Sequence, residues 1–242
     1  MKFFRNIRQR FINNKKIGNY LFYAIGEIIL VVVGILIALQ INNWNENQKL
    51  RTAEKSLYLN IMKDLDKEYQ VLKEQLNLSE ILKVSYRKIH EFASGTSNEL
   101  DLEYPTLLFQ SINFNSLVLQ NYEKSVDQIT SDSLRSDLNE YLITAKELST
   151  RRREEVEEIK TVRRPFILNN NIVDLDKLLY DNSELASINL NSFKETKGSE
   201  DYKRFITSGY ASNQALIYHS KYIIDLNRAL KIKLENSELL NE

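Results

Sequence analysis

The sequence predicts an all-α protein with a single N-terminal transmembrane helix followed by an antiparallel helical bundle. Three observations predict it: one long apolar run, few helix breakers, and apolar residues spaced by three and four. The 242 residues include only six Gly and two Pro, and 27% are charged. No Gly or Pro occurs between Gly34 and Gly95. This pattern is typical of long helices that bury one face.

Residues 21–41 read LFYAIGEIILVVVGILIALQI, in which only Glu27 and Gln40 are strongly polar. At 1.5 Å per residue this run is about 31 Å long, which matches the apolar core of a bilayer. We expect a transmembrane helix over residues 20–44. A cleaved signal peptide is disfavoured because the run is long and no A-x-A site follows it. Aromatic side chains that would anchor the helix at the two interfaces flank the run: Tyr20, Tyr23 and Trp44.

The flanking charges predict the orientation of this helix. Residues 1–19 contain no acid, and only three basic residues occur in the fifteen positions after Ile41. The positive-inside rule then places residues 1–19 in the cytoplasm, and residues 45–242 outside the cytoplasmic membrane. Apolar residues at helical spacing make the first segment a basic amphipathic helix that can bind lipid headgroups. Its basic residues are Lys2, Arg5, Arg8, Arg10, Lys15 and Lys16.

The rest of the chain is acidic and lacks cysteine. Residues 20–242 contain 27 basic and 33 acidic side chains, a net charge of −6. Nucleic-acid binding requires a basic surface, so we expect no nucleic-acid partner. The absence of cysteine excludes disulfides, thiolate nucleophiles and cysteine-ligated metals.

Small residues in the apolar helix predict a helix–helix contact within the membrane. Gly26, Gly34 and Ala38 lie on one stripe, where a second helix could approach closely. Ordinary use of small residues is the alternative. Glu27 lies near the same face, and an intramembrane acid pairs, takes up a proton or reaches the interface. The partner would be another copy of the chain or a different membrane protein.

The run YAIGEIILVVVGILIALQINNWNE, from Tyr23 to Glu46, carries a family resemblance, as does the basic FFRNIRQRFINN before it. It resembles an uncharacterised membrane-anchored family of Bacteroidota, the domain of unknown function 6090. The resemblance covers about the first fifty residues and fades beyond them. It implies a bacterial origin, and with the predicted orientation it implies an inner-membrane protein whose residues 45–242 lie in the periplasm. It implies no mechanism.

The sequence of the soluble part predicts a bundle of three or four long helices. We expect the first helix to continue to about Ala93 and a loop to follow. One or two shorter helices should occupy residues 106–130, separated near Asn113 to Asn115. The apolar stripe of the first helix alternates by four and three, in the manner of a coiled coil: Tyr58, Met62, Leu65, Tyr69, Leu72 and Leu76.

Serine residues mark the starts of the two later long helices. Ser131 is a suitable N-cap for one that Pro165 should end. Ser199 is suitable for another that should run to about Leu239. The charged stretch RRREEVEEIKTVRR in the first of these predicts a solvent-exposed face, with a favourable Glu147–Arg151 spacing. A short helix is expected near Asp174–Tyr180.

A search for chemical sites predicts no catalytic, cofactor-binding or metal-binding residues. His90 and His219 are isolated, and no phosphate-binding glycine loop or G-x-S-x-G turn is present. Asp174 and Asp176 could ligate calcium, but helix capping explains them better. Four tyrosines on the last helix could line a groove, but packing at the edge of the bundle is favoured: Tyr202, Tyr210, Tyr218 and Tyr222.

These observations favour a non-enzymatic interaction or scaffold component of the cell envelope. The alternative is an extracytoplasmic sensory or ligand-binding bundle, which would need a partner for signalling because nineteen residues cannot form a folded effector. A pilin-like subunit is a further option, but Glu27 lacks the usual spacing from a processing site. An enzyme is the remaining reading, and no motif supports it.

Overall fold

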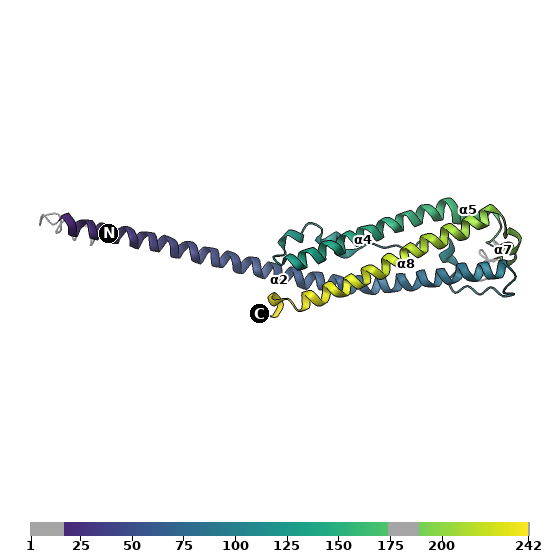
Figure 1. Cartoon of the computed structure of the whole chain (residues 1–242), viewed down its shortest axis with the longest axis horizontal. Coiled ribbons are helices and arrows are strands. Elements are labelled where there is room, and N and C mark those ends of the chain that lie inside the picture. Colours follow the sequence, from purple (N-terminus) through teal and green to yellow (C-terminus); the bar gives the residue numbers. More distant parts are fainter. Residues whose placement is uncertain (1–16, 174–188, 242) are drawn as a thin grey trace. The chain divides into compact units, whose positions relative to one another are not determined.

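The computed structural model describes residues 17–173 and 189–241, which form an all-α fold (Figure 1). The predicted fold class is confirmed. The chain divides into two compact units, Met1–Ser56 and Leu57–Glu242, which are described separately. Residues 1–16 and 174–188 lie outside the described ranges, and so do the six basic residues of the N-terminal segment and the calcium candidates Asp174 and Asp176.

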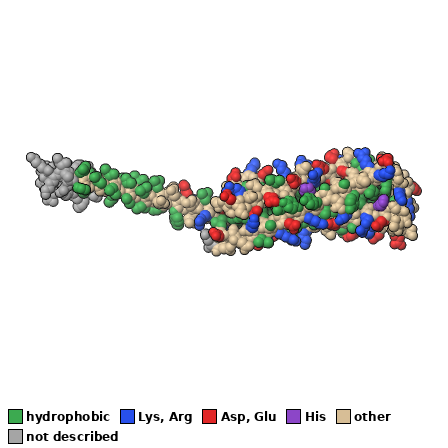
Figure 2. All heavy atoms as spheres, in the orientation of Figure 1, with side chains coloured by type: hydrophobic (Ala, Val, Ile, Leu, Met, Phe, Trp, Pro, Cys, Tyr) green, Lys and Arg blue, Asp and Glu red, His purple; other side chains and the backbone are tan. Residues whose placement is uncertain are grey.

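The first long helix, α2, spans Ile17–Ala93, so its predicted end at Ala93 is confirmed. Its N-terminal part is apolar and uncovered: an 18-residue window has a mean hydropathy of 2.6, and none of it is buried. Within the described residues this is the one helix long and apolar enough to cross a membrane. Figure 2 shows that hydrophobic side chains cover most of the surface of this stretch.

The second unit is built on three long helices: residues 57–93 of α2, α4 (Asp132–Glu158) and α8 (Glu200–Glu235). Ion pairs fix their directions. On α2, Asp66 binds Lys231 and Glu80 binds Lys221, so α8 runs antiparallel to α2. On α4, Asp137 binds Lys233, while Glu147 lies near His219, so α8 is antiparallel to α4 as well. Consequently α2 and α4 are parallel to each other.

A crossover, residues 94–131, makes this parallel pair possible because it carries the chain back along α2. Lys88 donates to the Asp101 carbonyl, Gln75 to the Asn113 carbonyl, and Asn121 to Asp64, in that order along the bundle. The predicted short helices are η1 (Pro105–Leu108), α3 (Leu117–Tyr122) and η2 (Val126–Gln128). The stretch Asn113 to Asn115 separates η1 from α3, as expected.

The two serine N-caps are confirmed. Ser131 Oγ accepts from the Leu134 amide at 3.4 Å, and Ser199 Oγ accepts from the Tyr202 amide at 3.0 Å. The last helix is shorter than predicted because Asn236 ends α8, and α9 (Glu238–Asn241) follows as a separate turn. Before α8, the segment α7 (Leu190–Thr196) packs against it.

Pro165 does not end its helix, contrary to prediction. The chain passes from α4 through a π-helical turn, η3 (Ile159–Arg163), into α5 (Arg164–Asn169). Proline lacks an amide hydrogen, and its ring clashes with the carbonyl four residues earlier in a regular α-helix. Because a π-turn is wider, it moves that carbonyl away and lets the helix continue past the proline.

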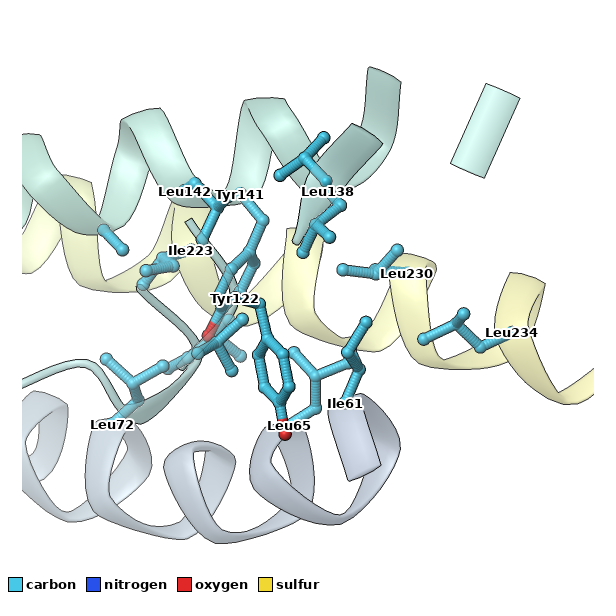
Figure 3. Packing of buried hydrophobic residues seen from close by; sticks show 14 of the residues in the cluster. Ile61, Leu65, Leu72, Tyr122, Leu138, Tyr141, Leu142, Ile223, Leu230 and Leu234 are labelled. Carbon is cyan, nitrogen blue, oxygen red and sulfur yellow. The ribbon is translucent and has the colours of Figure 1, made fainter. Parts of the chain in front are cut away.

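The bundle contains two apolar clusters rather than one. The first surrounds Leu65, Leu138 and Leu230, and the second surrounds Ile89, Phe166 and Phe205. Figure 3 shows the first cluster, where side chains from α2, α4 and α8 interdigitate and the hydroxyls of Tyr122 and Tyr141 point toward α2. The second is rich in aromatic rings; Phe166 and Phe205 stack with centroids 4.5 Å apart.

Gly209 on α8 permits one close contact inside the second unit. A Cβ atom at this position would lie 2.1 Å from the hydroxyl oxygen of Tyr86, which is itself 1% exposed. Tyr86 packs edge-to-face against Phe205, so its ring has little freedom to withdraw. The absence of a side chain at Gly209 therefore sets how closely α2 and α8 approach here.

We expect Gly209→Ala to destabilise the bundle by about 1–3 kcal/mol, because overpacking exceeds the better helix propensity of alanine. Combining it with Tyr86→Leu should remove most of the added penalty, since the two residues are in contact. Chemical denaturation in detergent measures both effects, with Ser208→Ala as the control. A neutral Gly209→Ala variant would contradict this packing.

Candidate functional site

Two carboxylates one turn apart on α2, Asp64 and Glu68, face the crossover. Glu68 lies between Leu65 and Leu72 on the seam of α2, which is the face of the helix that packs into the bundle, and it is 2% exposed. Asp64 is 9% exposed. Neither was singled out from the sequence. The spacing of three and four around Leu65 and Leu72 was the signal that could have identified Glu68.

Glu68 holds the start of α3. Its Oε2 accepts from the Ser116 hydroxyl at 3.1 Å and from the Val118 amide at 3.0 Å. Ser116 is also the N-cap of α3, since its Oγ accepts from the Leu119 amide at 3.0 Å. The carboxylate thus satisfies amide groups that a helix N-terminus leaves unpaired, and its charge is favourable there.

The second oxygen of Glu68 connects α2 with the other two long helices. Tyr141 on α4 donates its hydroxyl proton to Glu68 Oε1 at 3.0 Å. Asn227 on α8 donates to the Tyr141 hydroxyl at 3.2 Å and to the Leu65 carbonyl at 3.1 Å. One carboxylate therefore links α2, α3 and α4 directly, and it reaches α8 through a tyrosine.

Asp64 holds the end of α3. Its Oδ2 accepts from the Tyr122 hydroxyl at 2.8 Å and from the Asn121 side chain at 2.9 Å. Lys67 adds an ion pair at 3.1 Å on the other oxygen. Together the two acids fix both ends of this short helix to α2.

The two carboxylates have opposite electrostatic behaviour. Burial raises the pKa of the Glu68 carboxyl, although its hydrogen-bond donors act in the opposite direction. Burial also acts to raise the pKa of Asp64, but hydrogen bonds from Tyr122, Asn121 and Lys67 outweigh it and hold this pKa below its usual value. Glu68 therefore favours the neutral form relative to the unfolded chain, and Asp64 favours the charged form.

These directions predict the pH dependence of stability. A raised carboxyl pKa contributes stability at low pH that is lost as pH rises through the folded-state pKa of Glu68. The lowered pKa of Asp64 contributes stability at higher pH that is lost as pH falls through its folded-state value. Glu68→Gln should therefore reduce the loss of unfolding free energy as pH rises. Asp64→Asn should reduce the loss of unfolding free energy as pH falls. A tenfold change in proton affinity corresponds to about 1.4 kcal/mol, which sets the scale of each effect.

Denaturant unfolding of the detergent-solubilised protein across acidic and neutral pH measures both changes in unfolding free energy. Glu74→Gln is the matched control because Glu74 lies on the exposed face of α2. If Glu68→Gln and the control gave the same profile, Glu68 would not titrate in the way described.

A second group of charged residues is buried around the π-turn. Arg163 is 0% exposed and donates to Glu158 at 2.5 Å and to Glu155 at 3.3 Å. Arg152 donates to Glu155 at 3.1 Å. The stretch RRREEVEEIKTVRR was predicted to be solvent-exposed, and this is wrong for Arg152, Glu155 and Arg163. Arg152 and Glu155 continue the buried spacing of Ala145 and Leu148, so the seam of α4 remains buried although its residues become charged.

Not all of these buried groups find partners within the described residues. The Nε and Nη2 atoms of Arg152 have no hydrogen-bond acceptor there. The Oδ1 atom of Asn213 has no hydrogen-bond donor. Burial lowers the pKa of Arg152. Unpaired buried donors cost about 1–3 kcal/mol each. Gln75, Ser79 and Ser220 are buried as well, and we refer to the set of Arg152, Asn213 and these three residues as the polar layer.

The predicted residues of the apolar helix are exposed where they are described. Gly26, Gly34 and Ala38 are exposed, and a Cβ at either glycine would meet nothing within 4 Å. Glu27 and Tyr23 are half-buried, and Trp44 is 65% exposed. The side chain of Tyr20 lies outside the description. This stripe is open to a neighbouring helix, and the predicted contact stays a prediction.

The histidines and tyrosines occupy separate places. The Tyr202 hydroxyl lies 3.4 Å from His90 Nδ1, whereas His219 is near Glu147 on another face. Tyr202 is buried, as expected from packing. Tyr210 and Tyr222 are 38% and 42% exposed, which is compatible with the expected packing at the edge of the bundle, whereas Tyr218 is 69% exposed and lies mostly outside it. Arg151, whose spacing from Glu147 favoured a pair with that residue, forms an ion pair with Glu154 at 2.8 Å. Across residues 17–173 and 189–241, no three His, Asp or Glu side chains are arranged to hold a metal ion.

Comparison with known proteins adds a family similarity. Residues 27–119 match a family of unknown function, DUF6090. The match includes most of the apolar helix, the buried carboxylates of α2 and the start of α3. No curated protein and no solved structure matches the chain. The match supports the family resemblance, extends it beyond the first fifty residues to residue 119, and indicates no activity.

Proposed function

We propose that this protein is a single-pass component of a bacterial inner membrane, with its N-terminus in the cytoplasm and residues 45–242 in the periplasm. There it acts as a non-enzymatic interaction or scaffold protein of the cell envelope. The observation that carries the proposal is the uncovered apolar stretch of α2. Large side chains such as Phe22, Leu30 and Ile37 are 78%, 74% and 55% exposed, which is unfavourable in water and favourable in lipid.

The polar chemistry of the bundle supports an interaction role over catalysis. Asp64, Glu68 and Tyr141 use their polar atoms to fasten chain segments to one another. Glu155 and Arg163 are likewise directed at each other. A buried carboxylate that holds a helix N-terminus has a structural task, and a catalytic group would instead have to reach a substrate.

The sensory alternative stays a prediction. The polar layer favours it, because unsatisfied groups such as those of Arg152 destabilise the interior of the bundle. Such a layer lowers the energy of rearranging the helices relative to a wholly apolar core. Signalling would still need a partner across the membrane.

The proposed topology can be tested directly because the chain contains no cysteine. Asp132→Cys would place one thiol at a site whose side chain is 94% exposed. In right-side-out vesicles, a membrane-impermeant maleimide should label Asp132→Cys without detergent. Gln9→Cys, in the N-terminal segment, should be labelled only after permeabilisation. The reverse pattern would invert the topology, and extraction of the protein by alkaline carbonate would exclude a spanning helix.

The predicted contact in the membrane can be tested with Gly34→Leu. A leucine there would obstruct close approach by a second helix, so the associated fraction should fall severalfold in mild detergent. Val32→Leu is the matched control because residue 32 lies on the opposite face of α2, by its helical spacing from Gly34. Sedimentation equilibrium measures the association. Equal association of both variants would remove the small-residue stripe from the interface.

A further inference from the structure

A surface groove between α2 and α8 has no role in the fold described so far. Two turns of α2, from Lys83 to His90, form one side, and Ile206 and Tyr210 of α8 form the other. The groove lies wholly within the second unit and has a volume of about 330 Å³, which is in the range of small-molecule pockets. Its length along α2 is about 10 Å. That length holds only about three residues of an extended peptide, and a stable protein interface needs about 800 Å² per partner, so the size suits a small molecule.

The groove has an apolar base and apolar walls. Tyr86 is 1% exposed and therefore lies at the bottom, whereas Val84 and Tyr210 are 36% and 38% exposed at the rim. Ile206 adds a half-buried aliphatic side chain. The side chain of Gln214 donates to the Tyr210 hydroxyl at 2.9 Å, which holds that ring in place. An aromatic or branched aliphatic group in the groove would therefore be covered by ordered apolar surface.

The polar side chains of the lining are hydrogen-bond donors. Lys83 and Arg87 are cations that can only donate. The Tyr210 hydroxyl accepts from its neighbour on α8, so its own hydrogen is still available. The Tyr202 hydroxyl lies 3.4 Å from His90 Nδ1 and can donate to it, which leaves the ring hydrogen on Nε2 as a further donor. In the part of the chain that the structure describes, no Asp or Glu lines the groove. Donors without carboxylates favour an anionic ligand.

Two acids on α2 flank the groove and leave its cations available. Glu80 lies 3.4 Å from Lys83, but Lys221 binds it more closely, at 2.7 Å. Glu91 lies 3.8 Å from Arg87, which is too far for a hydrogen bond. No other described residue hydrogen-bonds the Arg87 guanidinium, whose side chain is 68% exposed. Its planar fork can therefore bind the two oxygens of a carboxylate.

We propose that the α2–α8 groove binds a small organic anion, a carboxylate attached to an aromatic or branched aliphatic body. The carboxylate accepts two hydrogen bonds from Arg87 and is attracted by Lys83, while the body lies against Val84, Ile206 and the Tyr210 ring. This class of ligand matches both the apolar walls and the donor groups. The site goes beyond the interaction role proposed above and does not depend on it, and it gives the sensory alternative a ligand of stated chemistry.

The proposal can be tested with 2-naphthoate as the probe and its neutral amide, 2-naphthamide, as the matched control. Each is titrated into the full-length protein in detergent micelles, and ligand-observed NMR measures binding after subtraction of empty micelles. We expect 2-naphthoate to bind saturably and 2-naphthamide to bind about tenfold more weakly, because hydrogen bonds to a charged group are the stronger ones. Absence of saturable binding by 2-naphthoate, or equal binding by the amide, would overturn the proposal.

Two variants locate the bound probe. Arg87→Gln should weaken 2-naphthoate about tenfold because it removes the charge and the bidentate donor, whereas Arg153→Gln, an exposed cation on α4, should not. Val84→Trp should abolish binding by filling the groove. Val71→Trp is its control, since Val71 is 44% exposed on α2 and does not line the groove. Thermal unfolding by circular dichroism verifies that the variants are folded. Unchanged binding in folded Arg87→Gln or Val84→Trp would place the probe elsewhere and reject the site.

An acidic segment of a partner protein is the competing occupant, and poly-L-glutamate represents it. We expect poly-L-glutamate to displace little 2-naphthoate, since it has no apolar body to fill the groove. If poly-L-glutamate bound in an Arg87-dependent manner and 2-naphthoate did not bind, the small-ligand proposal would be overturned in favour of a protein partner. None of these measurements depends on membrane orientation or on self-association, so their failure is distinguishable from a failure of the proposed function.

Discussion

The organisation of the soluble bundle depends on the hydrogen bonds of one buried carboxylate, Glu68. The crossover buries apolar side chains such as Leu108 and Val118 in the two clusters, but much of it is irregular and such apolar contacts are not directional. Glu68 supplies a fixed point because it accepts from the start of α3 and from Tyr141 of α4. Asp64 secures the other end of α3. The crossover is thereby held along α2, and this is what allows α2 and α4 to run parallel.

Much of this fold was predictable because its signals are local. The end of α2 at Ala93 and the serine caps Ser131 and Ser199 follow from breakers and capping chemistry in the adjacent sequence. The parallel arrangement of α2 and α4 was not predictable in the same way, because it depends on contacts such as Glu68–Ser116, which join residues 48 positions apart. Pro165 was misread because proline usually ends a helix, whereas a π-turn accommodates it here.

The polar interior was missed for a related reason. Charge in the sequence indicates solvent exposure, and that rule holds for Lys146 and Glu154. It fails for Arg152 and Glu155, which follow the buried spacing of α4. Periodicity was the better guide at these positions, and the expectation that charge stays outside overrode it. The helix–helix contact expected at Gly26, Gly34 and Ala38 stays a prediction.

The packing of α8 against α2 also has a consequence for biosynthesis. The seam of α2 is synthesised first, yet α8 covers it through contacts such as Asn213 to Ser79 and Asn227 to Leu65, which span 134 and 162 residues. Closing such long loops is slow compared with forming local helices. During translation, the apolar face of α2 must therefore wait, exposed, until almost the whole chain has emerged. That interval is when the nascent protein is most open to aggregation and to chaperone binding.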